Sequence, residues 1–367
     1  MPRIFKSVDG LLLFAVALLV IGGLFIFLSA SLGLLARDGA QFSDVATSQI
    51  LLGLGGGFIA MLIALSVPYR FWRKYALYLF IIAVILSVLV FVPGIGLELK
   101  GAHRWLQVGP FTFQPSEALK IGYVLYLAAW LSSVKRKIGN PMLGLFPFAI
   151  ITVLVGGVLL FQPDTDTFLI IAASGGAMFF AAGAKWRDLG IILLVGVLTL
   201  GIVIWQRPYV YDRIQTFLDP SRDPQGSSYQ IQQSLLAIGA GEVFGRGFGQ
   251  SVQKFGNLPE PISDSIFSVF AEEFGFVGSV ALIVAFLIFA LRGLWIATRA
   301  PDLFGGLLAT GIVSLIIIQS FMNIAAMLGL FPLSGLPLPF VSHGGSALLI
   351  ALGMVGLLMS VSRSVRS

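Results

Sequence analysis

A carboxylate stands directly before a long apolar run in the last third of the chain. Asp264 follows Ser263 and precedes residues with helical apolar spacing. A carboxylate at the edge of a membrane cavity can accept a proton and so act as a general base. A Ser or Asp at this position can equally serve as the N-cap of the helix. The spacing alone leaves both roles open.

Glu117 and Lys120 form an acid–base pair where another apolar run begins. Their spacing of three residues places both side chains on one helix face. Ionisable residues within a membrane span are costly and are candidate functional residues by default. A neutralising salt bridge accounts for the same spacing, so both substrate binding and simple charge pairing are open.

The string QPDTDT at 162–167 carries two carboxylates, Asp164 and Asp166, between two apolar runs. Two carboxylates in so short a loop could bind a cation or orient a polar substrate. Asp and Thr are also favoured N-cap residues. We therefore expect at least one of the two acids to cap the following helix.

The segment 206–275 is rich in glycine and contains two basic residues suited to an anion, Arg246 and Lys254. Glycines expose backbone N–H groups, so the segment could bind phosphate, although a linker or turn is the commoner reason for such a composition. Glu272 and Glu273 lie deeper in the apolar pattern, where an unpaired charge is costly. They are expected to pair with Lys or Arg.

Two further segments interrupt the apolar pattern. Residues 332–346 contain three Pro and three Gly, which excludes a regular helix. Non-helical backbone at membrane depth persists only inside protein or along a cavity. Within this segment, His343 is most simply a hydrogen-bonding residue. The segment 93–117 carries interfacial aromatic residues and is expected to be an anchored, re-entrant or surface loop.

Membrane spans must position these residues, because no soluble fold could bury the apolar surface of this chain. Apolar residues make up 57% of the 367 residues and charged residues 11%, with a mean hydropathy of +0.96. We predict an all-α polytopic membrane protein. The chain has no Cys, which excludes thiol chemistry, and its two His lie far apart, which argues against a His-rich metal site.

A span needs about 20 apolar residues. The pattern predicts ten spans in a single integral membrane domain, 1–367, with a large extracytoplasmic loop at 206–275. The predicted spans are Leu11–Leu35, Ile50–Val67, Ala76–Val92, Ala118–Val134, Leu143–Phe161, Phe168–Ala184, Leu189–Trp205, Phe276–Ala297, Leu307–Phe331 and Ser346–Val361.

The charges orient these spans. With a cytoplasmic N-terminus, most of the 23 Lys and Arg residues fall in short cytoplasmic segments, as the positive-inside rule requires. Of the 17 acidic residues, only Asp9, Asp188 and Asp302 fall on that side. Both termini are therefore expected in the cytoplasm. The outer face carries the other acids and the long loops, and is the expected working face.

Several ordered strings resemble one family. They are AHRWLQVGPFTFQPSE, QPDTDT, YQIQQSLLAIGAG, GRGFGQSVQKFGNLPE, SDSIFSVFAEEFGFVG and NIAAMLGLFPLSGLPLPFVSHGGS. With the ten-span layout they resemble the FtsW/RodA/SpoVE (SEDS) family over nearly the whole chain. The resemblance implies a GT-C-like SEDS fold and a peptidoglycan glycosyltransferase that polymerises lipid II at the outer face of the bacterial cytoplasmic membrane. SVQK before LPE, and YQIQQS, are more similar to the FtsW branch, which acts in cell division.

The resemblance also assigns residues by position. The matching residues are Asp264 for the essential acid of D-x-I-F, Glu117 and Lys120 for the pair of Q-P-S-E-x-x-K, Asp164 for the acid of Q-P-D-x-G-T, and Ser342 in the string that is usually S-Y-G-G-S. The chain departs from the family pattern at Asp166 in place of Gly, Ser265 in place of Phe and His343 in place of Tyr.

The implied reaction converts an α-linked donor sugar into a β-1,4 glycosidic bond. Inversion in one displacement needs a base for the acceptor hydroxyl and positive groups for the departing pyrophosphate. Asp264 is the expected base, and Arg104, Arg246 and Lys254 are expected pyrophosphate contacts because of their charge and placement. No cofactor is assigned, and a divalent cation, Mg or Mn, is a candidate near the pyrophosphate.

The implied partners are lipid II, a class B penicillin-binding protein transpeptidase, divisome proteins and membrane lipids, with no nucleic acid. The alternatives are a lipid II flippase or transporter, a RodA-like elongation polymerase, another polyprenyl-sugar transferase such as an O-antigen polymerase or ligase, and a scaffold. Intramembrane charges and a broken helix also occur in transporters. Here, however, the charges gather on one side rather than at the midplane.

Overall fold

The structure is a computed structural model that describes residues 8–37, 39–99, 102–109, 111–219 and 227–365. Most of these residues are helical, because a backbone in lipid must satisfy its N–H and C=O groups internally. The α-helices are α1 (Gly10–Arg37), α2 (Gly39–Thr47), α3 (Gly57–Ser66), α4 (Tyr69–Leu89), α5 (Pro115–Val134), α6 (Leu145–Phe161), α7 (Thr165–Ala181), α8 (Trp186–Gln206), α9 (Pro208–Leu218), α10 (Ser227–Ala240), α11 (Ile266–Arg299), α12 (Leu303–Met327) and α13 (Gly345–Ser362). A π-helix, η2 (Ser48–Gly56), and two 3₁₀ turns, η3 (Lys135–Lys137) and η4 (Gln253–Phe255), complete the helical elements.

Every one of the ten predicted spans overlaps a helix. Among the described residues, seven helical segments are long and apolar enough to cross a membrane by themselves. The remaining three predicted spans correspond to α6 and α7, which are shorter apolar helices, and to α5. The polytopic helical architecture is therefore confirmed, whereas the count of ten stays a prediction.

The segment 93–117 is folded, and the expectation of a plain loop there was incomplete. It forms a three-stranded antiparallel sheet of β1 (Gly96–Leu99), β2 (Ala102–Val108) and β3 (Phe111–Phe113) in the order β1-β2-β3. Trp105 pairs with Leu97 and Leu106 with Phe113. Strand pairing satisfies backbone groups that a bare loop would leave open. The protein is thus all-α apart from this small sheet, within the part of the chain that the structure covers.

The segment 206–275 also contains more helix than a loop would. It includes α9 and α10, and its last ten residues already belong to α11, which the sequence pattern placed from Phe276 onward. The apolar pattern did not show that residues 266–275 and the following span form one element, because α11 bends at Gly275, whose φ of 66° and ψ of −163° are not helical. Only glycine adopts this conformation without steric cost.

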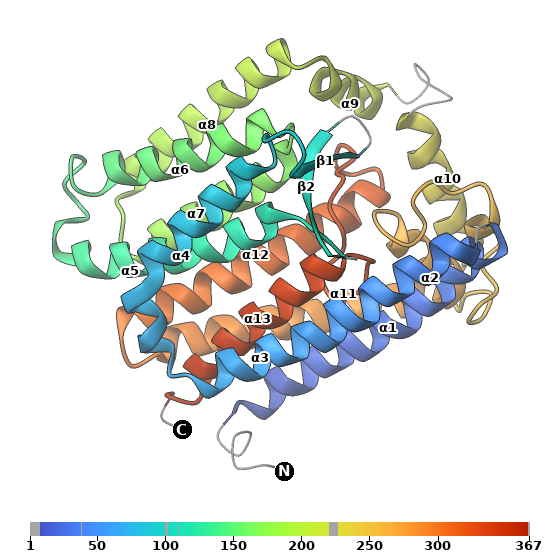
Figure 1. The fold of residues 1–367 in the computed structure, drawn as a ribbon, viewed down its shortest axis with the longest axis horizontal. Helices are drawn as coiled ribbons and strands as arrows, with labels where there is room; N and C mark the ends of the chain where they lie inside the picture. Colours follow the sequence, from blue (N-terminus) through green and yellow to red (C-terminus); the bar gives the residue numbers. More distant parts are fainter. Residues whose placement is uncertain (1–7, 38, 100–101, 110, 220–226, 366–367) are drawn as a thin grey trace.

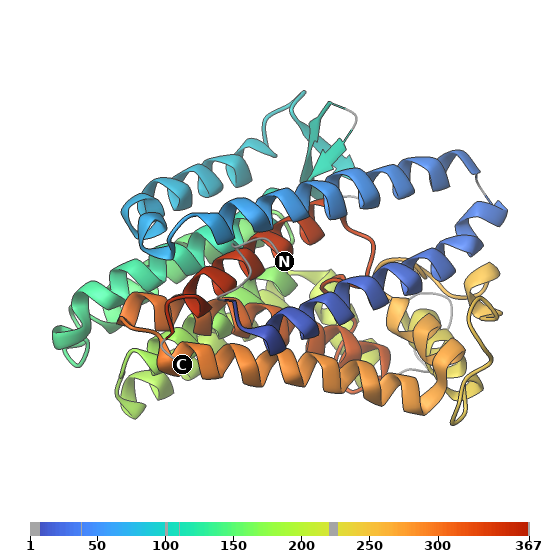
Figure 2. The ribbon, with the colours of Figure 1, turned by 90° about the horizontal axis from the view of Figure 1, so that it is seen from below.

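The centre of the bundle is formed by α12 and α13, whose apolar windows are 67% and 78% buried, whereas that of α8 is 6% buried. Figures 1 and 2 show α12 and α13 enclosed by the other long helices, with α8 at the edge. Near the two ends of the chain, the Asp9 carboxylate binds Arg292 at 2.6 Å, and its backbone N–H donates to the Ser362 hydroxyl. The starts of α1 and the end of α13 therefore lie together, at the end of the bundle away from α9, α10 and the sheet (Figure 1).

Candidate functional site

A non-helical strap, residues 328–344, connects α12 to α13 and holds the segment that contains Asp264. The backbone N–H of His343 donates to the Ile262 carbonyl at 2.7 Å, and the Ser342 hydroxyl donates to the Ser263 carbonyl at 2.6 Å. These bonds explain how a segment with three prolines persists at the bundle end, since its polar groups are paired with protein. Ser342 thus has a structural contact; its expected role in substrate binding stays a prediction.

Asp264 itself is partly exposed and precedes the first turn of α11. Ser265 occupies the N-cap position without a side-chain cap bond, and the Ser263 hydroxyl donates instead to Glu260 at 3.0 Å. The N-cap alternative therefore does not account for either Ser263 or Asp264. The Asp264 carbonyl is held at 2.8 Å by the side-chain amide of Asn323 on α12.

Three charged side chains from separate elements surround Gly335 of the strap. Asp166, in the first turn of α7, accepts a hydrogen bond from the Gly335 N–H at 3.1 Å and forms an ion pair with Arg213 of α9 at 2.8 Å. A Cβ added to Gly335 would lie 3.7 Å from Arg213 Nη2 and 3.9 Å from Asp264 Oδ2. The Asp264 carboxylate and the Arg213 guanidinium therefore share one small region beside a residue without a side chain.

Sequence reasoning did not single out Arg213. It is one basic residue among several in a long segment, and the only local signal is the amphipathic pattern of α9. In the structure, Tyr209 lies one turn before Arg213, and its hydroxyl donates to the Pro163 carbonyl at 3.1 Å. The two side chains attach α9 to the turn at 162–167, which the linear spacing could not indicate.

Asp164 and Asp166 have different partners in the structure. Asp164 is the N-cap of α7 and accepts a hydrogen bond from the Thr167 N–H, so the expected capping is confirmed for this residue. Its other oxygen, Oδ2, is buried with no hydrogen-bond partner among the described residues. Asp166 pairs with Arg213 rather than with a second carboxylate.

Arg104 of β2 attaches the sheet to this same turn. Its Nε donates to the Gln162 carbonyl at 3.0 Å, and its Nη2 donates to the Pro163 carbonyl. These bonds direct the guanidinium to backbone acceptors in the turn that carries Asp164. The expected pyrophosphate contact by Arg104 stays a prediction.

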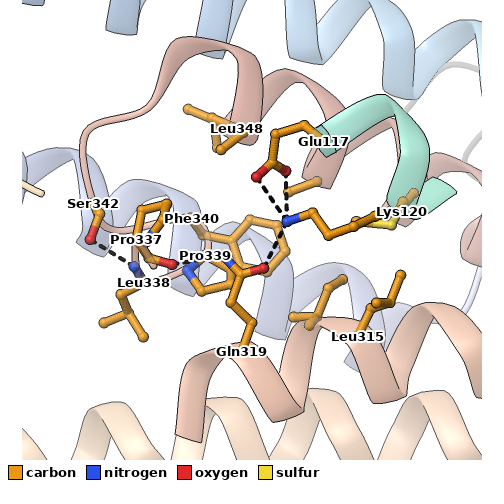
Figure 3. A pocket seen from close by; sticks show the side chains of 14 residues that line it. Glu117, Lys120, Leu315, Gln319, Pro337, Leu338, Pro339, Phe340, Ser342 and Leu348 are labelled. Carbon is orange, nitrogen blue, oxygen red and sulfur yellow. Dashed lines mark hydrogen bonds and ion pairs between the residues drawn. The ribbon is translucent and has the colours of Figure 1, made fainter. Parts of the chain in front are cut away.

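Glu117 and Lys120 form a buried ion pair in the first two turns of α5, with side chains 4% and 2% exposed. Lys120 Nζ lies 2.8 Å from Glu117 and donates to Gln319 Oε1 at 2.9 Å. Figure 3 shows Gln319 between Lys120 and Pro337 of the strap. They line a cavity of about 20 Å³, which is enough for one water molecule. Charge pairing is confirmed, and a direct substrate role stays a prediction.

Lys254 lies elsewhere, and its expected contact with pyrophosphate is wrong for this geometry. Its ammonium is fully buried and has three acceptors: Glu273 at 2.7 Å, the Gly249 carbonyl at 2.9 Å and the Ser29 hydroxyl at 3.0 Å. A lysine ammonium has three donors. All are used inside the protein, so none is left for a substrate.

The glycine-rich segment around Arg246 packs against the bend in α11. The N–H groups of Arg246 and Gly247 donate to the Glu272 and Glu273 carbonyls at 3.0 and 2.9 Å. These amides serve the bend, so they cannot form the phosphate cradle that the glycine content suggested. The Arg246 guanidinium lies 3.7 Å from the Glu272 carboxylate. The expectation of basic partners for Glu272 and Glu273 is confirmed.

His343 is half-buried in the strap and stacks on Phe27 of α1. Burial lowers the pKa of His343 to about 4, although the Glu260 carboxylate and a hydrogen bond to the Val45 backbone act in the opposite direction. The imidazole is therefore neutral at physiological pH. For metal ions, no group of three or more His, Asp or Glu side chains suitable as ligands occurs in the described ranges, and the Mg or Mn candidate stays a prediction.

Comparisons with known proteins agree with one another. The family model FTSW_RODA_SPOVE, described as "Cell cycle protein", matches residues 9–367. The chain is 39% identical to stage V sporulation protein E of Bacillus subtilis over 360 residues, which cover 98% of each protein. It is also 39% identical to a probable peptidoglycan glycosyltransferase FtsW of Geobacter sp. (strain M18) over 367 residues, again 98% of each.

Two solved structures are similar over almost their full length. One is a chain of a peptidoglycan synthase complex that coordinates polymerization and crosslinking, with a TM-score of 0.78, 30% identity and 98% of each chain covered. The other is the rod shape determining protein RodA of Thermus thermophilus, with a TM-score of 0.71, 29% identity and 99% of each chain covered.

Proposed function

The chain belongs to the FtsW/RodA/SpoVE (SEDS) family, and from this premise we propose that it polymerises lipid II into β-1,4 glycan strands. Relatives named as probable peptidoglycan glycosyltransferases support the reaction class. Their name, FtsW, also supports a role in cell division rather than RodA-like elongation. The positive-inside distribution of Lys and Arg supports an outer-face reaction with both termini in the cytoplasm.

Asp264 is the general base in this proposal. The acceptor 4-hydroxyl gives its proton to the Asp264 carboxylate while its oxygen bonds to the donor C1. The bond from C1 to the pyrophosphate oxygen breaks, and undecaprenyl pyrophosphate departs with the bonding electrons. One inverting displacement needs only one carboxylate as base and no carboxylate nucleophile, unlike retaining glycoside hydrolysis.

Arg213 takes the role of the cation near the departing pyrophosphate, in place of Lys254. Its guanidinium is about one-third exposed, and Asp166 holds one edge of it by the ion pair at 2.8 Å. A fixed guanidinium stabilises developing phosphate charge with little reorganisation. The observation that carries the proposal is that Asp264 Oδ2 and Arg213 Nη2 both lie within 4 Å of the position that a Cβ on Gly335 would take.

The location of these groups favours a transferase over a flippase. Asp264 precedes α11 and Asp166 is in the first turn of α7, so both lie at helix ends, and Arg213 is on α9, a short helix outside the predicted spans. Transporter sites of the broken-helix type lie near the membrane midplane. These positions therefore support chemistry at one membrane surface.

Two apolar grooves on the bundle surface suit prenyl chains. One, of about 340 Å³, lies between α3, α4, α5 and α13, and its lining includes Ala118 and Ile121, which neighbour Glu117 and Lys120 in the sequence. The other, of about 610 Å³, lies between α1 and α11. Their linings are almost wholly apolar, as burial of a hydrocarbon tail requires. A lipid-linked substrate could thus keep its tail in the membrane and its sugar at the strap.

A class B penicillin-binding protein transpeptidase is the proposed protein partner, together with other divisome proteins. The support is the similarity to a chain of a complex that coordinates polymerization with crosslinking. Lipid II and surrounding membrane lipids complete the proposed ligands.

The test is glycan synthesis from lipid II by the purified full-length chain in detergent, alone and with its transpeptidase partner. Wild type should form polymer, whereas Asp264→Asn, which keeps the volume but loses the base, should not. Glu98→Gln is the matched control, because Glu98 is an exposed acid of the sheet. Polymer formation by Asp264→Asn at the wild-type rate would overturn the assignment of Asp264 as base. Absence of polymer from wild type under all of these conditions would overturn the proposed function.

A further inference from the structure

Two carboxamide side chains project from one face of α12 toward the strap. Gln319 and Asn323 are one helical turn apart, and both are buried, with 5% and 0% exposure. Gln319 Nε2 donates to the Pro337 carbonyl at 2.8 Å, and Asn323 Nδ2 donates to the Leu336 carbonyl at 2.8 Å. One helix face therefore holds two consecutive carbonyls of a segment that forms neither a helix nor a strand.

Asn323 has a second acceptor in the candidate site. The same Nδ2 donates to the Asp264 carbonyl at 2.8 Å, so both amide hydrogens are used. Both acceptors are carbonyl oxygens, and the reversed amide would face them with its own oxygen, which fixes the orientation. A single NH₂ group thus ties the residue that carries the base to the strap.

The oxygen of this amide is not used in the same way. Asn323 Oδ1 is buried and has no hydrogen-bond partner in the part of the chain that the structure describes. A buried acceptor without a partner is costly. An apolar residue would avoid that cost at this position, so its presence indicates that the two donated bonds matter.

Gln319 extends the connection to the buried ion pair. Its Oε1 accepts from Lys120 Nζ at 2.9 Å, while its Nε2 holds Pro337 (Figure 3). Two residues before Pro337, the Gly335 N–H is held by Asp166 at 3.1 Å. The strap is therefore fixed at 335, 336 and 337 by three side chains, and Asn323 is the one that also holds Asp264.

We propose that Asn323 is a positioning residue of the transferase reaction: by holding the Asp264 and Leu336 carbonyls with one amide, it sets the base against the Gly335 face of the strap. The inference rests on the proposed function. Asn323 acts through Asp264 and the strap and does not touch the substrate, and Gln319 supports the same strap from Lys120.

The test measures kcat, KM and thermal stability for lipid II polymerisation by purified full-length variants. Asn323→Ala removes both donors and should lower kcat by up to about 100-fold, the effect of a misplacement near 1 Å, with KM within about twofold. Asn323→Ser returns one donor, and its kcat should lie between those of wild type and Asn323→Ala. Ser320→Ala is the matched control, because the buried Ser320 hydroxyl bonds only within its own helix, to Ile316 at 2.7 Å.

A packing role alone would lower the unfolding temperature and the yield, and leave kcat per folded molecule unchanged. The proposal is overturned by wild-type kcat in folded Asn323→Ala, or by an equal loss of kcat in Ser320→Ala. If Asn323→Ala does not fold, Asn323→Ser decides by the same criterion. Asp264→Asn is run beside them: its inactivity with a normal Asn323→Ala would overturn only the positioning role, whereas its normal activity would overturn the base.

Discussion

Two buried lysine–glutamate pairs in this protein have almost the same geometry and different surroundings. Lys120–Glu117 spans 2.8 Å and Lys254–Glu273 spans 2.7 Å, and all four side chains are at most 4% exposed. Lys254 donates to three acceptors, and Glu273 also receives bonds from the Ser29 hydroxyl and the Ser251 N–H. Lys120 instead adjoins a cavity of about 20 Å³ and is connected through Gln319 to the strap.

A buried ion pair therefore does not by itself identify a functional site. The Lys254 pair joins α1 to α11 and the glycine-rich segment, with every donor satisfied, which is the arrangement of a scaffold. The Lys120 pair lies where α5, α12 and the strap meet, and Gln319 connects it to the strap that holds the segment of Asp264. The residues around the Lys120–Glu117 pair, rather than the N–O distance within it, associate the pair with the reaction.

Removal of the Lys254 charge should have the largest effect, and on stability. Lys254→Met leaves the Glu273 carboxylate buried without its cation, which should cost about 3–5 kcal/mol of unfolding free energy. The double variant Lys254→Met/Glu273→Met should recover most of it. Thermal unfolding in detergent measures both, with the exposed Lys137→Met as control. Wild-type stability of Lys254→Met together with loss of polymerisation would show instead that Lys254 takes part in the reaction.

Replacement of Arg213 should have the next largest effect, and on rate. Arg213→Gln removes the guanidinium beside Gly335 and should lower kcat by roughly 10²–10³, as loss of one electrostatic contact to developing charge does. Arg246→Gln, in the scaffold region, should stay within about twofold. Initial rates on lipid II measure both. Comparable losses in the two variants would support Arg246 as a pyrophosphate contact as well.

Reversal of the Lys120 pair should separate pairing from substrate contact. Glu117→Lys and Lys120→Glu each place like charges together and should destabilise the fold. The double reversal restores the pairing but moves the ammonium away from Gln319, and we expect folded protein with at least a tenfold lower rate, about 1.4 kcal/mol. Full recovery of both stability and rate would show that this pair is scaffold as well.

The strap should respond to mild acid through His343, the smallest of these effects. The pKa of His343 is lowered to about 4 from 6.5, so the unfolded state binds the proton first and stability falls as pH drops from 6.5 toward 4. Between pH 7 and 5.5 the loss should be about 1 kcal/mol. His343→Tyr removes this titration. The same pH dependence of the unfolding temperature in both proteins would assign it to other groups.

The sequence predicted what local pattern determines. Apolar run lengths located the helices. A cap was expected from at least one of Asp164 and Asp166 because both stand before a helix, and basic partners were expected for Glu272 and Glu273 because burial requires them. These inferences depend on neighbours in the chain or on a general cost of unpaired charge.

The pattern could not predict contacts between distant segments. Asp166 and Arg213 are 47 residues apart, and Asp264 and Asn323 are 59 apart. No periodicity specifies which loop a given arginine meets, so Arg213 and Asn323 were missed and Lys254 was assigned to the wrong partner. The sheet of β1, β2 and β3 was not predicted for a related reason, because its short strands gain their stability by pairing with one another.

The decisive measurement is the rate of glycosidic bond formation per folded molecule at saturating lipid II. Comparing Asp264→Asn with Lys254→Met tests whether Asp264 is the base and Lys254 is scaffold. We predict that Asp264→Asn unfolds at the wild-type temperature and loses at least about 10² in rate. Lys254→Met should do the opposite, with lowered stability and a near-normal rate in the molecules that remain folded. A near-normal rate in folded Asp264→Asn would contradict the account.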